Sequence, residues 1–108
     1  MDRKSNKEII IELKKFIKLV NKQFKLENAI LFGSRAREDH LNSSDVDLIL
    51  VSNDFKNISF KKRGIEFIDL WNEPIDIQIL CYTQEEFNKL KKQLGIVSQA
   101  IKEGIILN

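Results

Sequence analysis

One stretch of the chain joins two apolar segments through a few polar residues at fixed spacing. Residues 28–32 are mostly apolar and run into Gly33-Ser34, and after ten further residues Asp45-x-Asp47 leads a second apolar segment. A Gly-Ser pair after a strand permits a tight turn and offers N–H groups and a hydroxyl to an anion. Aspartates at i and i+2 of a strand point the same way, with Cα atoms roughly 6.5–7 Å apart. Their charges repel unless a divalent cation lies between them, so the pattern indicates a phosphate and metal site.

The composition is typical of one small globular domain. The chain has 108 residues, 43% hydrophobic and 31% charged, which allows a single domain spanning 1–108. The N-terminus is polar and no apolar run reaches about 18 residues, so we expect a cytoplasmic protein without signal peptide or membrane span. Over residues 1–25 Lys and Arg outnumber Asp and Glu. This excess is typical either of a solvated helix surface or of a nucleic-acid-binding face.

Apolar periodicity predicts strands alternating with helices. We expect helices at 5–24, 34–39, 60–71, 83–94 and 96–103, strands at 29–32, 45–51 and 75–80, and an extended tail at 105–107. Ser5 with Glu8, and Thr83 with Glu86, fit capping boxes. This order favours an α/β (α+β) domain with a three- or four-stranded sheet covered by helices.

Side-chain alternation assigns a face to each residue of the second and third strands. In the third strand, Ile75, Ile77 and Ile79 are predicted on one side and Asp76 and Gln78 on the other. In the second strand, Val46, Leu48 and Leu50 form an apolar face. The opposite face carries Asp45, Asp47, Ile49 and Val51. Only the leading end of that strand is polar, which is typical of a site at a sheet edge. Cys81 and Trp71 are predicted to pack in the core, the latter in preference to stacking on a base.

The Gly-Ser motif, its spacer and the Asp-x-Asp pair resemble the signature of nucleotidyltransferases of the DNA polymerase β type. The segments LFGSRAR and SSDVDLILV are similar to those of minimal nucleotidyltransferases. The resemblance implies a polymerase β-like nucleotidyltransferase fold, with a small mixed sheet covered by helices. It also implies a third carboxylate on a later strand, between hydrophobic residues. Ile75-Asp76-Ile77 matches that pattern, although a solvated aspartate at a strand end is the alternative interpretation.

This resemblance implies a nucleotidyl transfer reaction, most simply of AMP from ATP to a hydroxyl. Asp45, Asp47 and Asp76 are then expected to be catalytic and to bind two Mg²⁺ ions, which prefer hard oxygen ligands. Gly33 and Ser34 are expected to hold the β- and γ-phosphates of ATP.

Two arginines follow the Gly-Ser motif. Arg35 and Arg37 either contact the triphosphate or the acceptor, or pair with Glu38, Asp39 or the site carboxylates. Many relatives have glycine where this chain has Glu38, so the loop conformation there is open. His40 falls in the spacer and is predicted to lie in a surface loop.

The resemblance finally implies a protein partner. Minimal nucleotidyltransferases are commonly encoded beside a helical HEPN protein, and some are antitoxins that adenylylate a tyrosine of that toxic ribonuclease in a type VII toxin–antitoxin pair. The expected sheet and helices use essentially all 108 residues, so we expect the acceptor on a separate chain, preferably such a HEPN-family toxin. The alternatives are a non-catalytic module that neutralises a partner by docking, and transfer to RNA or a small molecule.

Overall fold

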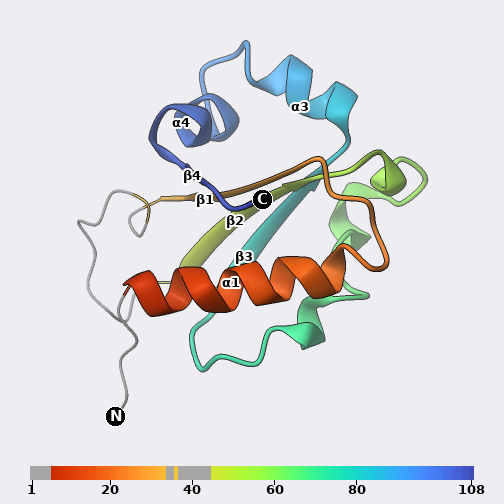
Figure 1. Ribbon diagram of the computed structural model, residues 1–108. Helices are drawn as coiled ribbons and strands as arrows, with labels where there is room; N and C mark the ends of the chain where they lie inside the picture. Colours follow the sequence, from red (N-terminus) through yellow and green to blue (C-terminus); the bar gives the residue numbers. More distant parts are fainter. Residues whose placement is uncertain (1–5, 34–35, 37–44) are drawn as a thin grey trace.

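Four strands form one mixed sheet. The computed structural model describes residues 6–33, 36 and 45–108. The strands are β1 (Asn28–Phe32), β2 (Val46–Val51), β3 (Ile77–Tyr82) and β4 (Ile105–Ile106), in the spatial order β3-β2-β1-β4. β2 and β3 are parallel, whereas β1 is antiparallel to both β2 and β4 (Figure 1). The predicted α/β fold with a small mixed sheet is therefore confirmed.

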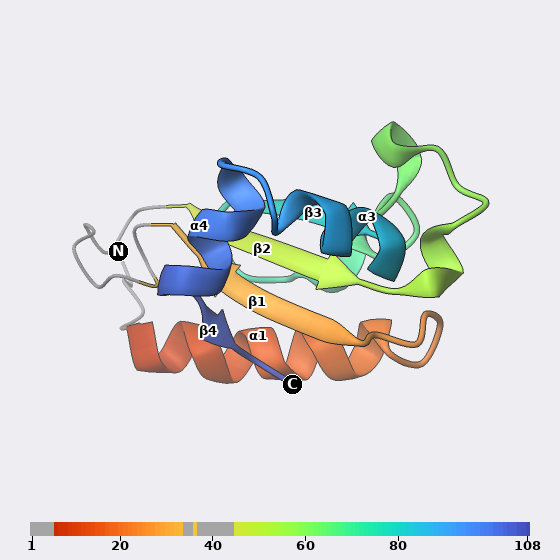
Figure 2. The same cartoon turned by 90° about the horizontal axis from the view of Figure 1, so that it is seen from above.

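Helices cover both faces of this sheet. Helix α1 (Asn6–Val20) lies on one face, and α3 (Gln84–Leu90) and α4 (Ile96–Glu103) lie on the other (Figures 1 and 2). The core is accordingly split into two clusters. On the α1 side, buried apolar residues of that helix pack on the sheet residues Val46, Leu48 and Leu50. On the other side, a second cluster joins the sheet to α3 and α4: Ile30, Ile49, Val51, Phe87, Val97 and Ala100.

Several local predictions are confirmed. β2 alternates as expected, with its two sets of apolar side chains in different core clusters. Ile75, Ile77 and Ile79 pack against the α1-side cluster. Thr83 and Glu86 form the predicted capping box at the start of α3, whereas Ser5 lies outside the described residues.

The predicted helix over residues 60–71 is wrong. The structure has two short 3₁₀ helices there, Phe60–Lys62 and Ile68–Leu70, and another at Asn53–Phe55. Gly64 lies between the first two with φ +95°, a left-handed conformation that ends a right-handed helix. These residues also share no buried face, because Phe67 is buried while Phe60 and Ile68 are exposed.

Other element boundaries differ from the predicted ones. β3 begins and ends two residues later than expected because it pairs in register with β2, from Val46↔Ile77 to Val51↔Tyr82. α1 ends at Val20, followed by a turn. α3 ends at Leu90 rather than Leu94, because the residues that follow bury no apolar surface against the core. The C-terminal tail contributes the short strand β4.

The two predicted core residues are where the sequence placed them. Cys81 is buried, and burial raises the pKa of its thiol to about 12, so it stays protonated at neutral pH. Trp71 packs against the α1-side cluster, with its ring 5.7 Å from that of Phe16. No helix in the described part of the chain has the length and apolar character needed to cross a membrane.

Candidate functional site

Asp45 and Asp47 lie at the leading end of β2. Asp45 immediately precedes the strand and is exposed, whereas Asp47 is half-buried within it. Burial and the nearby negative charge of Asp45 both raise the pKa of Asp47. The two carboxylates are therefore close enough to repel each other, as expected of groups that share a cation.

Asp76 lies beside this pair across the parallel strands. The N–H of Val46 donates to the carbonyl oxygen of Asp76 at 2.9 Å, so Asp76 is level with the start of β2. Ile77, the next residue, packs on the α1 side, and alternation therefore puts Asp76 on the opposite face, the face of Asp47. Asp76 is exposed. The backbone thus brings all three aspartates to one end and one face of the sheet.

Gly33 follows β1 on the other side of Asp47. Phe32 pairs with Asp47 in the antiparallel register, and Gly33 continues from it with φ +79°. A Cβ atom added to Gly33 would lie 2.5 Å from Oδ2 of Asp47. The glycine therefore serves two needs at once: a left-handed turn at the strand end and space for the carboxylate.

Several predicted site residues lie outside the described part of the chain. These are Ser34, Arg35 and Arg37; most of the predicted helix 34–39 and residues 40–44, with His40 of the predicted surface loop, lie outside it as well. Ala36 is described, and its N–H donates to the carbonyl oxygen of Gly33 at 3.1 Å.

The chemistry of the three aspartates fits Mg²⁺, which binds carboxylate oxygens. The mutual repulsion of Asp45 and Asp47 fits a cation between them. As their side chains are placed, no group of three His, Cys, Asp or Glu residues within the described ranges is arranged to hold a metal ion. The fit thus rests on the donor atoms and on the shared strand end, and a bound ion requires the exposed Asp76 side chain to turn toward the pair.

The sequence reasoning did not single out Gln78. This residue pairs with Asp47 in the parallel register and is exposed, so it lies on the same face at the same end of the sheet. Its amide can donate to a phosphate or accept from a hydroxyl. Its alternation with Asp76 is visible in the sequence, but its alignment with Asp47 depends on the pairing of two strands.

Three comparisons relate the chain to known proteins. A family model described as a nucleotidyltransferase domain matches residues 13–107. A protein of Methanocaldococcus jannaschii named "putative protein adenylyltransferase" is 38% identical over 72 residues, which are 67% of this chain and 72% of that protein. A crystal structure titled as a "putative nucleotidyltransferase" from Sulfolobus solfataricus matches 94% of this chain and 80% of its own with a TM-score of 0.66. Its 20% sequence identity makes this a similarity of fold.

Proposed function

Because this chain belongs to the nucleotidyltransferase domain family, we propose that it transfers AMP from ATP to a hydroxyl group of a partner protein. Nucleotidyl transfer itself is the activity of the family. The choice of AMP and of a protein acceptor is supported by the name of the M. jannaschii relative. The cytoplasm, which supplies both ATP and Mg²⁺, is the compartment we propose.

The observation that carries this proposal is the grouping of carboxylates beside a glycine turn. Asp45 and Asp47 repel each other at the end of β2, and Gly33 leaves room for the Asp47 carboxylate. Asp76 adds a third carboxylate at the same strand end, by its hydrogen bond with Val46. A polyphosphate chain and divalent cations are the ligands that such a combination suits.

Each residue then has a role in the reaction. Mg²⁺ bound by Asp45, Asp47 and Asp76 would offset the charge of the triphosphate and make the acceptor hydroxyl more acidic. The N–H groups of Gly33 and Ser34, with the Ser34 hydroxyl, hold the β- and γ-phosphates. Asp76 helps to take the proton of the acceptor hydroxyl while the hydroxyl oxygen bonds to the α-phosphorus. The bond from that phosphorus to the bridging oxygen breaks, and pyrophosphate leaves.

The acceptor we propose is a tyrosine of a helical HEPN-family toxin, which makes this chain its antitoxin. This choice is supported by the resemblance to minimal nucleotidyltransferases. The exposure of Asp45, Asp76 and Gln78 is compatible with a large acceptor, since these side chains are open to a molecule that approaches the sheet end. Arg35 and Arg37 are candidates for contact with the triphosphate or this acceptor.

A second candidate function is neutralisation of the partner by docking alone. It is favoured by exposed apolar side chains on the α4 side of the molecule: Leu94, Ile96, Ile101 and Ile106. Transfer to RNA has less support, because the exposed lysines of α1 lie on the sheet face opposite Asp47. These include Lys14, Lys15 and Lys18.

The experiment that separates these functions is transfer of labelled AMP from ATP in Mg²⁺, with the product of the neighbouring gene as acceptor. Asp47→Asn is expected to reduce transfer by more than about a hundredfold, because it removes a charge that holds the metal. Folding should persist, since Asp47 lies at a strand end and is only half-buried. Asp69→Asn, which removes an exposed carboxylate of the 3₁₀ helix Ile68–Leu70 outside the group of three aspartates, is the matched control. Near-normal transfer by Asp47→Asn would remove Asp47 from the mechanism.

A further inference from the structure

A hydrogen bond closes the loop that leads into Asp76. The indole Nε1–H of Trp71 donates to the carbonyl oxygen of Ile75 at 2.8 Å, in a partly buried position. The bond spans Asn72, Glu73 and Pro74, and the proline ring further restricts the backbone between its ends. Indole is a donor with a single N–H, so this contact uses all its hydrogen-bonding capacity.

The peptide that carries Asp76 is therefore held on two sides. Its leading carbonyl, that of Ile75, accepts from Trp71, and the Ile75 side chain packs against the α1-side core. Its own carbonyl accepts from the N–H of Val46, the residue between Asp45 and Asp47. These contacts fix the backbone of Asp76 relative to the other two carboxylates, while its exposed side chain remains able to turn.

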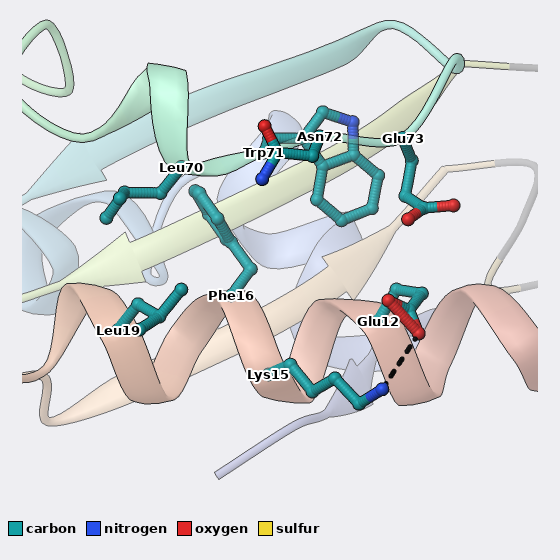
Figure 3. Close-up of a pocket in the computed structure, with 8 residues that line it drawn as sticks. All are labelled: Glu12, Lys15, Phe16, Leu19, Leu70, Trp71, Asn72 and Glu73. Carbon is teal, nitrogen blue, oxygen red and sulfur yellow. Dashed lines mark hydrogen bonds and ion pairs between the residues drawn. The ribbon is translucent and has the colours of Figure 1, made fainter.

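The Trp71 ring is itself located by the core. It meets Phe16 of α1 edge to face, with centroids 5.7 Å apart and planes at 81°, and Phe16 similarly contacts Phe67. Figure 3 shows the Trp71 ring and Phe16 between α1 and the loop of Asn72 and Glu73. A cavity of about 190 Å³ also borders the ring, so packing does not enclose it completely. The hydrogen bond to Ile75 therefore fixes the orientation of the indole ring, which the partial packing around the ring does not.

We infer that Trp71 is a positioning residue for Asp76: through the carbonyl of Ile75 it fixes the backbone from which the Asp76 carboxylate turns toward a divalent cation shared with Asp45 and Asp47. The inference rests on the proposed function and deepens it. It links the α1 side of the sheet, where Trp71 packs, to the opposite face, where the carboxylates lie. Preorganised ligands bind a metal more tightly, because less conformational freedom is lost on binding.

The test is Mn²⁺ binding in the presence of ATP, measured from the electron paramagnetic resonance signal of free Mn²⁺. Trp71→Phe keeps an aromatic ring beside Phe16 but lacks the N–H. Loss of one net hydrogen bond is expected to weaken Mn²⁺ binding by about three- to tenfold. The Mg²⁺ concentration for half-maximal transfer should rise by the same factor, with maximal transfer recovered at high Mg²⁺. Replacement of Trp71 by its benzothienyl isostere, which deletes only the N–H, should give the same result.

The control is Phe55→Leu, which alters a buried ring of the same core near the other end of the sheet. It should lower the melting temperature without changing Mn²⁺ binding. If Trp71→Phe or the isostere binds Mn²⁺ as the wild type does, or if Phe55→Leu weakens binding equally, the positioning role is wrong and the proposed function stands. If Asp76→Asn leaves Mn²⁺ binding unchanged, Asp76 is no ligand, and both the inference and that part of the proposed function fail.

Discussion

At the scale of single residues, Gly33 and Gly64 have similar backbone conformations but different surroundings. Their φ angles are +79° and +95°, so alanine is strained at both, by about 1–2 kcal/mol. A Cβ atom at Gly64 would find its nearest neighbour at 3.8 Å, an ordinary contact. At Gly33 it would lie 2.5 Å from the Asp47 carboxylate. The two positions therefore separate backbone strain from displacement of a site residue.

We expect Gly33→Ala and Gly64→Ala to lose similar amounts of unfolding free energy, about 1–2 kcal/mol each, in chemical denaturation. Only Gly33→Ala should also reduce AMP transfer, by about tenfold or more, because Asp47 must move. Equal transfer rates in the two variants would show that the Asp47 carboxylate adapts without loss.

Asp47 provides a second prediction, for the metal-free protein in EDTA. Folding raises its pKa above the ordinary value of 3.8, so the folded state binds this proton more tightly than the unfolded state does. Ionisation of Asp47 therefore opposes folding. That cost is absent below pH 3.8, grows as the pH rises through the raised pKa, and is complete above it.

Asp47→Asn should consequently melt at a higher temperature than the wild type at neutral pH, and the difference should vanish as the pH falls toward 3.8. Melting curves across this range, with EDTA throughout, measure the effect. Asp69→Asn is the comparison for a general change in net charge. A neutral-pH gain that persists unchanged in acid would contradict the assignment to ionised Asp47.

At the scale of elements, Arg63 connects the segment 53–70, which contains the three 3₁₀ helices, to β3 and α3. Its side chain is only 5% exposed and donates to the carbonyl oxygens of Ile58 and Cys81. It also pairs with both carboxylate oxygens of Glu86, at 2.6 and 3.2 Å. Glu86 meanwhile caps α3 through the N–H of Thr83. One arginine therefore joins three segments that no continuous helix connects.

Glu86→Gln should weaken this junction while leaving the cap, because glutamine also serves in capping boxes. The hydrogen bond from Arg63 lowers the pKa of Glu86 below its ordinary value of 4.5. Its stabilisation is therefore present above pH 4.5 and is lost as the pH falls through the lowered pKa. We expect Glu86→Gln to lose about 1 kcal/mol of unfolding free energy at pH 7, a figure already reduced for partial solvent exposure. This loss should shrink in acid.

Denaturant unfolding at several pH values measures this difference. Glu12→Gln is the matched control, since it removes the more exposed pair with Lys15 at 3.3 Å and should change stability by less than about 0.5 kcal/mol. If Glu86→Gln lost the same unfolding free energy at every pH, the effect would belong to the helix cap and not to the ion pair with Arg63.

The sequence predicted helices and strands well where the apolar pattern of neighbouring residues determines them. β1, β2, α1 and α4 follow from apolar periodicity, and the face of Asp47 follows from alternation along β2. The prediction for the segment 60–71 failed because its conformation depends on Gly64 and on contacts of Arg63 with β3 and α3. The position of β3 depends likewise on its partner β2.

For the candidate site, the motif named the aspartates, but only the folded chain reveals which groups surround them. The closeness of Gly33 to Asp47 comes from pairing between β1 and β2. The position of Gln78 comes from pairing between β2 and β3. The contact of Trp71 with Ile75 depends on a turn whose conformation no periodicity encodes.

At the scale of the whole molecule, the proposed site lies at the leading end of β2, on the sheet face against which α3 and α4 pack. α3 and α4 join the second core cluster through Ile30, Ile49 and Val51, whereas Asp45, Asp76 and Gln78 remain exposed. Among the described residues, the exposure of these three side chains makes them accessible to a protein acceptor of the kind we propose.

We expect mass spectrometry of the co-expressed HEPN-family partner to show an added AMP on a tyrosine. The adduct should disappear when this chain carries Asp45→Asn, because that change weakens metal binding without altering the core. Asp69→Asn should leave the adduct in place. A partner that is inactivated and co-purified without any nucleotide would contradict AMP transfer and favour docking alone.

The pairing of β4 with β1 has a consequence for how the protein is made. β1 is flanked by β2 on one side and by Ile105 and Ile106 on the other, and these two residues leave the ribosome long after β1 does. During translation the outer edge of β1, with the apolar residues Ile30 and Leu31, therefore stays unpaired. Unpaired strand edges recruit other chains. Nascent chains on crowded polysomes are thus most exposed to mutual association in the interval before β4 leaves the ribosome.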